Sequence, residues 1–255
     1  MSLMQRKLGC DPKVTDERTL QLANYLRLDK LPVIPNAIDW GATQGKSWGV
    51  MRNDELGCCV LAGLGHLVQL WTHNRPNGRM LTVSDDEVVK AYHDVGGYVP
   101  GRSDTDRGAN MLKACKYMCK TGVGGHKALA FAEIDPTHEA MSRAALWLFG
   151  GLFDAYDLPI SAQSQDTWDS APGGSDTGDY KPRSWGGHAV VTMRQDRDTS
   201  ACVTWGYVQP MTERFQKQYC RERYVFLSED WLTNGESIAG FDKKALLADL
   251  QRVTR

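Results

Sequence analysis

Apolar residues recur at three- and four-residue intervals over much of the first 150 positions, the spacing of a helix with one buried face. The pattern is strongest over residues 57–71, which we predict to form a long helix. Its apolar stripe consists of Val60, Leu64, Leu67, Val68 and Trp71. Further helices are predicted over residues 16–28, 84–92, 109–121 and 138–149.

Capping residues support the boundaries of three of these helices. Ser84 is followed three positions later by Glu87, which is the pairing of a capping box. Asp16 can cap the helix over residues 16–28, and Gly122 can close the helix over residues 109–121.

The second half of the chain favours strands. A polar stretch rich in Gly, Asp and Ser covers residues 161–187, and β-rich runs follow at residues 188–193, 201–205 and 224–227. Helices first and strands later indicate an α+β fold with two lobes. We predict an N-terminal extension with one helix (1–37), a helical lobe (38–155) and a β-rich lobe (156–255), with residues 38–255 forming one domain.

The composition excludes several classes of protein. The 255 residues carry 30 basic and 31 acidic side chains, and a net charge of −1 argues against a strongly basic nucleic-acid binder. No run reaches the ~20 apolar residues of a membrane span, and residues 1–8 lack the apolar stretch of a secretory signal. We therefore expect no nucleic-acid partner, no membrane partner and, among the seven cysteines, free thiols.

Two adjacent cysteines stand at the start of the strongest predicted helix. A helix N-terminus favours the thiolate through its partial positive charge and its unpaired N–H groups, so Cys59 is a candidate nucleophile. Gly57 allows a tight turn just before it. The alternative is that Cys58 and Cys59 are both small, buried residues at a helix start. We interpret Cys58 as a packed thiol.

A thiol nucleophile requires a base, and His188 is the candidate. His66 follows Cys59 by seven residues, which along a helix is roughly 10 Å and too far for a hydrogen bond. His188 follows two glycines, which permit close approach of a ligand, although it can equally be a structural histidine at a strand start. Cys115 and Cys119 share a helix face without a second pair of ligands, so we expect no metal and no cofactor.

These residues, in this order and spacing, resemble the papain-like cysteine protease superfamily. Trp40 precedes Cys59 by 19 positions, as in the segment that opens the family's domain, and His188 follows Cys59 by 129 positions. Asn53, six positions before Cys59, stands where the family has its oxyanion-hole glutamine. The resemblance implies a papain-like α+β fold. In it, a helical lobe carrying the nucleophile helix packs on an antiparallel β-rich lobe, with the active-site cleft between them.

The segment Thr204-Trp205-Gly206 is similar to the Ser-Trp-Gly that follows the family's third catalytic residue, and the resemblance implies that Trp205 shields the histidine. Two departures stand out. Leu56 replaces the family's disulfide cysteine, and the third catalytic residue falls on Val203 or Thr204, depending on the direction of counting. In serine-triad enzymes a faulty third member costs about 10⁴ in rate, or about 5.5 kcal/mol of barrier.

A nearer resemblance is to uncharacterised papain-like proteins encoded by bacteriophages and prophages. It rests on Lys7-Leu8-Gly9, on the Asn-Asp that precedes the cysteine turn, on the Trp-Gly strand and on the stretch from Met211 to Tyr224. This resemblance implies a location in the cytoplasm of a bacterial host or within a virion.

The function expected from these residues is that of a thiol hydrolase that cleaves peptide or amide bonds in a peptide or protein substrate. Cys59 would attack, His188 would move the proton, and Asn53 would stabilise the oxyanion. One alternative is a weak or inactive papain-like scaffold that binds other virion proteins, because the third catalytic residue is missing and residues 1–38 are too short for the family's inhibitory pro-region. Another alternative is an amidase of cell-wall peptides.

Overall fold

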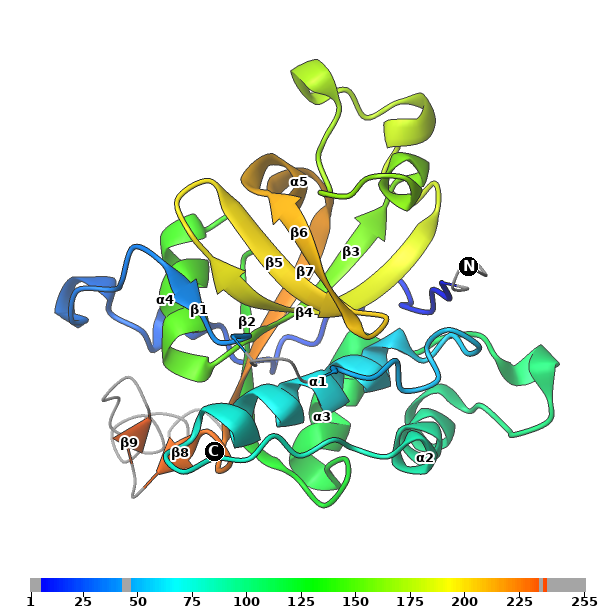
Figure 1. The fold of residues 1–255 in the computed structure, drawn as a ribbon, viewed down its shortest axis with the longest axis horizontal. Coiled ribbons are helices and arrows are strands. Elements are labelled where there is room, and N and C mark those ends of the chain that lie inside the picture. The colour runs from blue at the N-terminus through cyan, green and yellow to red at the C-terminus, as the bar shows by residue number, and fades with distance from the viewer. Residues whose placement is uncertain (1–5, 43–46, 234–235, 238–255) are drawn as a thin grey trace.

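The computed structural model describes residues 6–42, 47–233 and 236–237. An antiparallel sheet forms the upper part of Figure 1, and helices lie beneath it and beside it. The strands of this sheet follow the order β2-β7-β3-β4-β5-β6, and β1 pairs with β4. They are β1 (Ile38–Asp39), β2 (Ala128–Ile134), β3 (Leu152–Leu158), β4 (Gly186–Gln195), β5 (Thr199–Thr204), β6 (Tyr207–Thr212) and β7 (Cys220–Ser228). A separate short pair joins β8 (Leu232–Thr233) and β9 (Glu236–Ser237).

Four of the five predicted helices are present among the described residues: α1 (Cys59–Asn74), α2 (Asp85–Gly96), α3 (Met111–Lys120) and α4 (Glu139–Phe149). A further short helix, α5 (Glu213–Tyr219), was not predicted. Ser84 and Glu87 form the predicted capping box at the start of α2. Gly122 follows α3 with a φ of 84°, a conformation that favours glycine. Among the described residues, no helix has both the length and the apolar character needed to cross a membrane.

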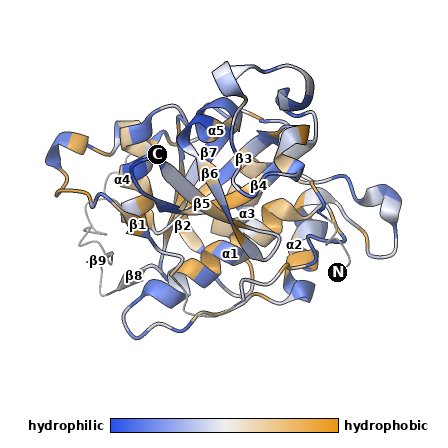
Figure 2. Cartoon of the chain, turned by 45° about the horizontal axis from the view of Figure 1, so that its top comes forward, coloured by the Kyte–Doolittle hydropathy of each residue, from blue (hydrophilic) through white to orange (hydrophobic). Residues whose placement is uncertain are grey.

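Helix α1 is the centre of the molecule. It packs on β4 and against α2 and α3, and almost its whole surface is buried, well beyond the predicted stripe. Figure 2 shows hydrophobic residues on α1 and on the strands above it, whereas the outer turns are hydrophilic. Because α1 is held on all sides, its first residue, Cys59, has a fixed position against the sheet.

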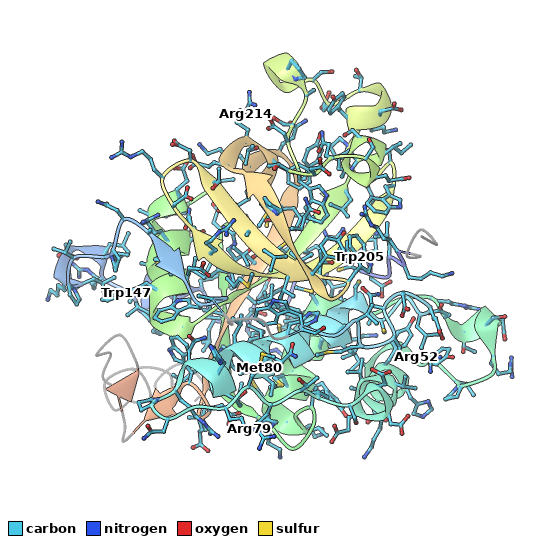
Figure 3. The ribbon with its side chains drawn as sticks, viewed as in Figure 1. Arg52, Arg79, Met80, Trp147, Trp205 and Arg214 are labelled. Atoms are coloured by element: carbon cyan, nitrogen blue, oxygen red, sulfur yellow. The ribbon has the colours of Figure 1, made fainter. Side chains whose placement is uncertain are left out.

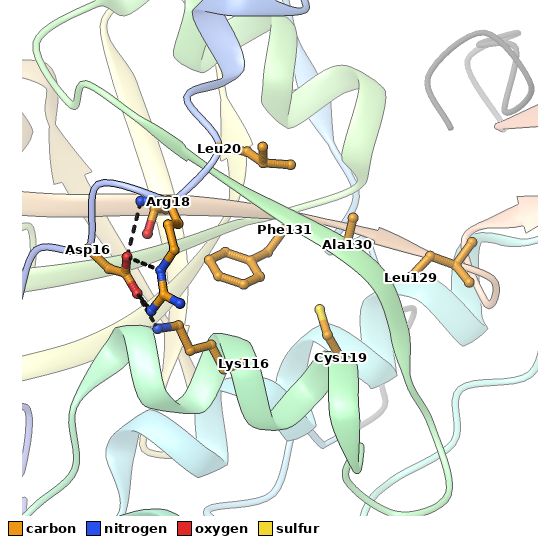
Figure 4. A pocket seen from close by; sticks show the side chains of 9 residues that line it. Asp16, Arg18, Leu20, Lys116, Cys119, Leu129, Ala130 and Phe131 are labelled. Atoms are coloured by element: carbon orange, nitrogen blue, oxygen red, sulfur yellow. Dashed lines mark hydrogen bonds and ion pairs between the residues drawn. The ribbon is translucent and has the colours of Figure 1, made fainter. Parts of the chain in front are cut away.

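The helix predicted over residues 16–28 is wrong. This segment forms two short 3₁₀ turns, at Leu22–Asn24 and Leu28–Lys30. The carboxylate of Asp16 bonds Arg18 and Lys116 rather than capping a helix, as Figure 4 shows. The segment also bonds to the edge of the sheet, because the Leu20 carbonyl accepts from the Glu133 amide. Pairing with the sheet and burial of scattered leucines outweigh the local helical preference.

The sheet takes its strands from both sides of the lobe boundary predicted at residue 156. Strand β2 and most of β3 come before this position, and β2 pairs with β7 along its whole length. Strand β4, which begins within the glycine-rich sequence before His188, lies between β3 and β5 and faces α1. The contact between α1 and β4 therefore brings Cys59, on α1, and His188, on β4, into one region.

Candidate active site

Cys59 is the first residue of α1 and is 1% exposed. Its position depends on a chain of hydrogen bonds through two residues that the sequence analysis missed. The Gly108 amide donates to the Tyr92 hydroxyl (2.8 Å), and that hydroxyl donates to Asp106 (2.7 Å). The same oxygen of Asp106 accepts from the Gly57 amide at 2.9 Å. These bonds fix the turn before the thiol relative to the segment after Asp106.

His188 lies in β4, directly opposite the start of α1. The backbone amide of the next residue, Ala189, donates to the Cys59 sulfur at 3.4 Å. The thiol at the start of α1 and the strand that carries His188, 129 positions later in the sequence, therefore lie in one region of the fold. That the Cys59 thiol and the His188 imidazole act together as a catalytic pair stays a prediction.

The ring of His188 is fully buried and held on two sides. Its Nε2 lies 2.6 Å from the Thr204 hydroxyl, and the indole of Trp205 stacks on it with ring centroids 4.1 Å apart. Its Nδ1 has no hydrogen-bond partner among the described residues. Burial, and to a smaller extent the charge of His66, lower the pKa of His188 to about 3. The ring is therefore a neutral imidazole near neutral pH.

Thr204, and not Val203, stands behind the imidazole. Successive residues of a strand point to opposite faces, so only one of the two can reach the ring. Val203 lies in the core with Val191 and Phe153, whereas the hydroxyl of Thr204 turns toward His188. Trp205 and Gly206 form the tight turn to β6, with φ values of 44° and 80°. Figure 3 labels Trp205 close to this turn, above α1.

Two opposing effects act on the thiol of Cys59. The backbone N–H groups of Ala189, Gly9 and Val60 point at the sulfur and lower its pKa. Burial is the larger effect and raises the pKa of Cys59 to about 11. In this structure Cys59 is therefore a neutral thiol and His188 a neutral imidazole near neutral pH.

Asn53 is buried beside the turn that precedes Cys59. Its side-chain amide donates to the Leu56 carbonyl at 3.0 Å and to the Lys7 carbonyl at 3.3 Å. The first bond holds the turn in place. The second bond joins the candidate oxyanion donor to the N-terminal part of the chain.

The N-terminal residues 6–11, which we call the covering segment, lie across the candidate site. The Lys7 carbonyl accepts from the Trp205 indole at 3.0 Å, as well as from Asn53. The amide of Cys10 donates to the Gly187 carbonyl at 3.0 Å, and Gly9 lies over the thiol. Every predicted site residue except His188 is thus in direct contact with this segment.

Ala109 holds the covering segment from the other side. Its amide donates to the Gly9 carbonyl at 2.8 Å, and its carbonyl accepts from the Asp11 amide at 3.0 Å, in a parallel bridge. The N-terminal extension is too short to resemble the family's inhibitory pro-region, yet six of its residues suffice to cover Cys59 and Asn53. Lys7-Leu8-Gly9 carried a signal for this placement, because a side chain at Gly9 would collide with the Gly57 carbonyl.

Two of the other cysteines, Cys10 and Cys58, lie near Cys59, and burial raises the pKa of both thiols. All seven are free thiols, and Cys58 donates to the Met51 carbonyl at 3.5 Å in a buried site where burial raises its pKa. Cys115 is buried within the core and Cys119 is half-buried. Across residues 6–42 and 47–233, no group of three or more His, Cys, Asp or Glu side chains is placed to hold a metal ion.

The sequence matches no family model and no curated protein. Several solved structures match the fold. Xylellain, a cysteine protease from Xylella fastidiosa, aligns with a TM-score of 0.64 and 14% identity, over 89% of this chain and 99% of that chain. ProCathepsin B S9 from Trypanosoma congolense aligns with a TM-score of 0.59 and 10% identity, over 88% and 87% of the two chains.

A third structure, digestive procathepsin L 3 of the larval midgut of Tenebrio molitor, has a TM-score of 0.59 and 12% identity, over 88% of this chain and 76% of that chain. Likeness at such low identity concerns the fold rather than the activity. The chain has the papain-like α+β fold that the sequence predicted, with the long helix α1 packed against an antiparallel sheet.

Proposed function

We propose that this chain is a thiol hydrolase that cleaves peptide or amide bonds and that residues 6–11 hold it in a covered state. One observation carries the proposal: the buried thiol of Cys59 accepts from the backbone beside His188, while the far nitrogen of that histidine is held by Thr204. A thiol at a helix start, an imidazole and a group that orients the imidazole are the parts of acyl transfer through a cysteine.

In the proposed reaction, Nδ1 of His188 takes the proton of the Cys59 thiol. The thiolate attacks the substrate carbonyl carbon, and the negative charge on the carbonyl oxygen is stabilised by the Asn53 amide and the backbone N–H of Cys59. Collapse of this intermediate forms a thioester and releases the amine, which receives the proton from His188. Water, deprotonated by the same imidazole, then hydrolyses the thioester and restores the thiol. The indole of Trp205 covers one face of the ring and excludes water there.

The covered state opposes this reaction in two ways. The Lys7 carbonyl uses the Asn53 amide that the oxyanion would need. Burial also keeps the thiol protonated and the imidazole neutral, and displacement of the covering segment would relieve this burial. Activity therefore requires that residues 6–11 leave the groove.

The test is the alkylation of Cys59 by an iodoacetamide probe at pH 7, read by mass spectrometry. The full chain is compared with its Gly9→Ala variant, in which the new side chain collides with the Gly57 carbonyl and displaces the segment. We expect Cys59 to react at least tenfold faster than the other thiols in the variant. A further His188→Ala change should remove this advantage. A rate in the variant equal to that of an ordinary exposed thiol would overturn the proposal.

A second candidate function is that of a papain-like scaffold that binds other proteins, such as those of a virion. Two features favour it: the Cys59 thiol is covered, and the third catalytic position holds the uncharged hydroxyl of Thr204. Stoichiometric copurification with particles, together with an unreactive Cys59 in the Gly9→Ala variant, would support this function. The phage origin and the host compartment rest on the sequence resemblance alone. Release of peptides from purified murein, rather than from proteins, would identify the chain as a cell-wall amidase.

A further inference from the structure

We propose that the groove beside Cys59 contains a cationic subsite, formed by Lys113, Arg183 and Arg221, that selects substrates with an acidic side chain near the cleaved bond. The inference rests on the proposed function and names the substrate class of the same groove. Its starting point is Asp11, the acidic residue of the covering segment, where burial raises the pKa and the charges of these three cations act against that rise.

The two arginines hold the covering segment through their Nη2 atoms. Nη2 of Arg221 donates to the Asp11 carbonyl at 2.6 Å and to the Cys10 sulfur at 3.0 Å. Nη2 of Arg183 donates to the Cys10 carbonyl at 3.0 Å. When the covering segment leaves, both Nη2 groups lose these partners while their side chains stay in place.

The remaining nitrogens explain why the arginines stay. Both guanidinium groups form ion pairs with Asp157 of β3, and the distance from Arg183 is 2.6 Å. Nε of Arg221 also lies 3.4 Å from the Glu222 carboxylate. The side chain of Arg221 is only 13% exposed, and that of Arg183 is 35% exposed. Guanidinium groups fixed in this way are pre-organised to bind a carboxylate in bidentate geometry.

The covering segment brings an acidic side chain to this cationic region. Asp157 and Glu222 stay paired with the two arginines, whereas the charge of Asp11 is present only while the covering segment is in place. Its departure leaves the Nη2 groups of Arg183 and Arg221 without the carbonyl oxygens that they hold. Charged donors released in this way favour a ligand that carries a carboxylate.

The position of the subsite follows from the backbone. Gly9 lies over the thiol, and Asp11 is two residues further along an extended segment, roughly 7 Å at the rise of a β-strand. The Asp11 amide bonds the Ala109 carbonyl, which is available to the backbone of any extended peptide in the groove. The acidic residue of a substrate should therefore be about two positions along the chain from the substrate residue that lies over the Cys59 thiol.

The first test uses the full chain and does not depend on hydrolysis. Asp11→Lys places a fourth cation among Lys113, Arg183 and Arg221, and should expel the covering segment. We expect the alkylation of Cys59 by iodoacetamide at pH 7 to rise at least tenfold. The same change at the exposed Val14 is the control and should have no effect. If Asp11→Lys leaves Cys59 as protected as in the wild-type chain, the cationic subsite is overturned.

The second test measures substrate choice in the Gly9→Ala chain with peptides that carry Asp, Asn or Lys at each position around the cleaved bond. At one position we expect at least tenfold higher kcat/KM for Asp than for Lys, and Lys113→Glu should reduce this ratio. Lys120→Glu, at the other end of α3, is the matched control and should leave the ratio unchanged.

Equal cleavage of all peptides would overturn the cationic subsite but leave the proposed hydrolase activity. An alkylation response to Asp11→Lys without hydrolysis of any peptide would overturn the hydrolase but leave the subsite.

Discussion

Nε2 of His188 and the hydroxyl of Thr204 lie 2.6 Å apart in a fully buried contact. The position that the resemblance assigns to the third catalytic residue is thus filled by a hydroxyl, which can accept a hydrogen bond from Nε2–H. In the proposed mechanism the proton is on Nε2, and the lone pair of Nδ1 acts as the base. Thr204 is in this sense a positioning residue, although a hydroxyl holds the ring by one bond from a rotatable group.

Replacement of this threonine by valine tests its role. Thr204→Val keeps the shape of the side chain but leaves Nε2 without a partner, so the imidazole loses its orientation. In the Gly9→Ala chain we expect the rate of Cys59 alkylation at pH 7 to fall about 10- to 100-fold, and Thr204→Ser to restore most of it. The stability should fall by about 1–3 kcal/mol because a buried donor is left unpaired.

The control is Val203→Ala, which alters the core at the neighbouring position and leaves the His188 contact intact. It should lower the stability without changing the pH at which alkylation reaches half its maximum rate. Loss of stability in Thr204→Val with no change in the alkylation rate or its pH profile would assign a structural role to Thr204.

The pH dependence of thiol reactivity should reveal the covered state. Burial raises the pKa of Cys59 to about 11, and only the thiolate reacts. In the wild-type chain, the alkylation rate of Cys59 should therefore rise about tenfold for each pH unit between pH 7 and pH 10. The Gly9→Ala chain should show a flatter profile that levels off at lower pH. Parallel profiles in the two chains, compared by mass spectrometry, would contradict the role of the covering segment.

The parts of the site that the sequence predicted are those fixed by local pattern. Cys59 at a helix start follows from the apolar stripe of α1, and His188 on a strand follows from the β-rich run after two glycines. Thr204 was one of two candidates, because counting along the sequence cannot determine which face of a strand meets the ring. Only the pairing of β5 with β4 determines this.

The parts that escaped prediction depend on contacts between distant segments. Nothing local in the residues around Leu20 indicates that Leu20 and Gln21 pair with Glu133 at the edge of β2, so the helical spacing of the leucines was misleading. The placement of Gly9 against Gly57 and Ala109 likewise joins segments about 50 and 100 positions apart. Single glycines in an irregular region predict close approach, but they do not name the partner.

The buried His66 should make the fold sensitive to acid. Its Nε2 lies 3.1 Å from the Gly49 carbonyl, and burial lowers its pKa to about 4. The unfolded chain binds a proton at this residue near pH 6.5. Between pH 6.5 and 4 the unfolded state therefore binds more protons, and the stability falls as the pH falls. His188, with its pKa lowered to about 3, adds to this loss.

The variant His66→Gln keeps an N–H donor for Gly49 and removes the titration. We expect the loss of stability between pH 7 and pH 4.5, measured by urea unfolding, to shrink by about 2–3 kcal/mol. The same replacement at the exposed His93 should retain the full loss. An acid response unchanged by His66→Gln would show that other groups cause it.

The hydrogen bonds through Tyr92 should matter for both stability and the groove. Its hydroxyl joins the Gly108 amide to Asp106, which holds Gly57 just before the thiol. Tyr92→Phe leaves the Gly108 amide unpaired and frees Asp106 to move. We expect a loss of about 1–3 kcal/mol in urea unfolding, together with faster alkylation of Cys59 in the wild-type background, because Ala109 then holds the covering segment less firmly. The control is Tyr117→Phe, which removes a more exposed hydrogen bond from a hydroxyl to Asp94. It should change the stability and the alkylation rate of Cys59 by less than Tyr92→Phe does. If Tyr92→Phe lowered the stability but left Cys59 fully protected, the turn before the thiol and the segment around Ala109 would have to be held independently of each other.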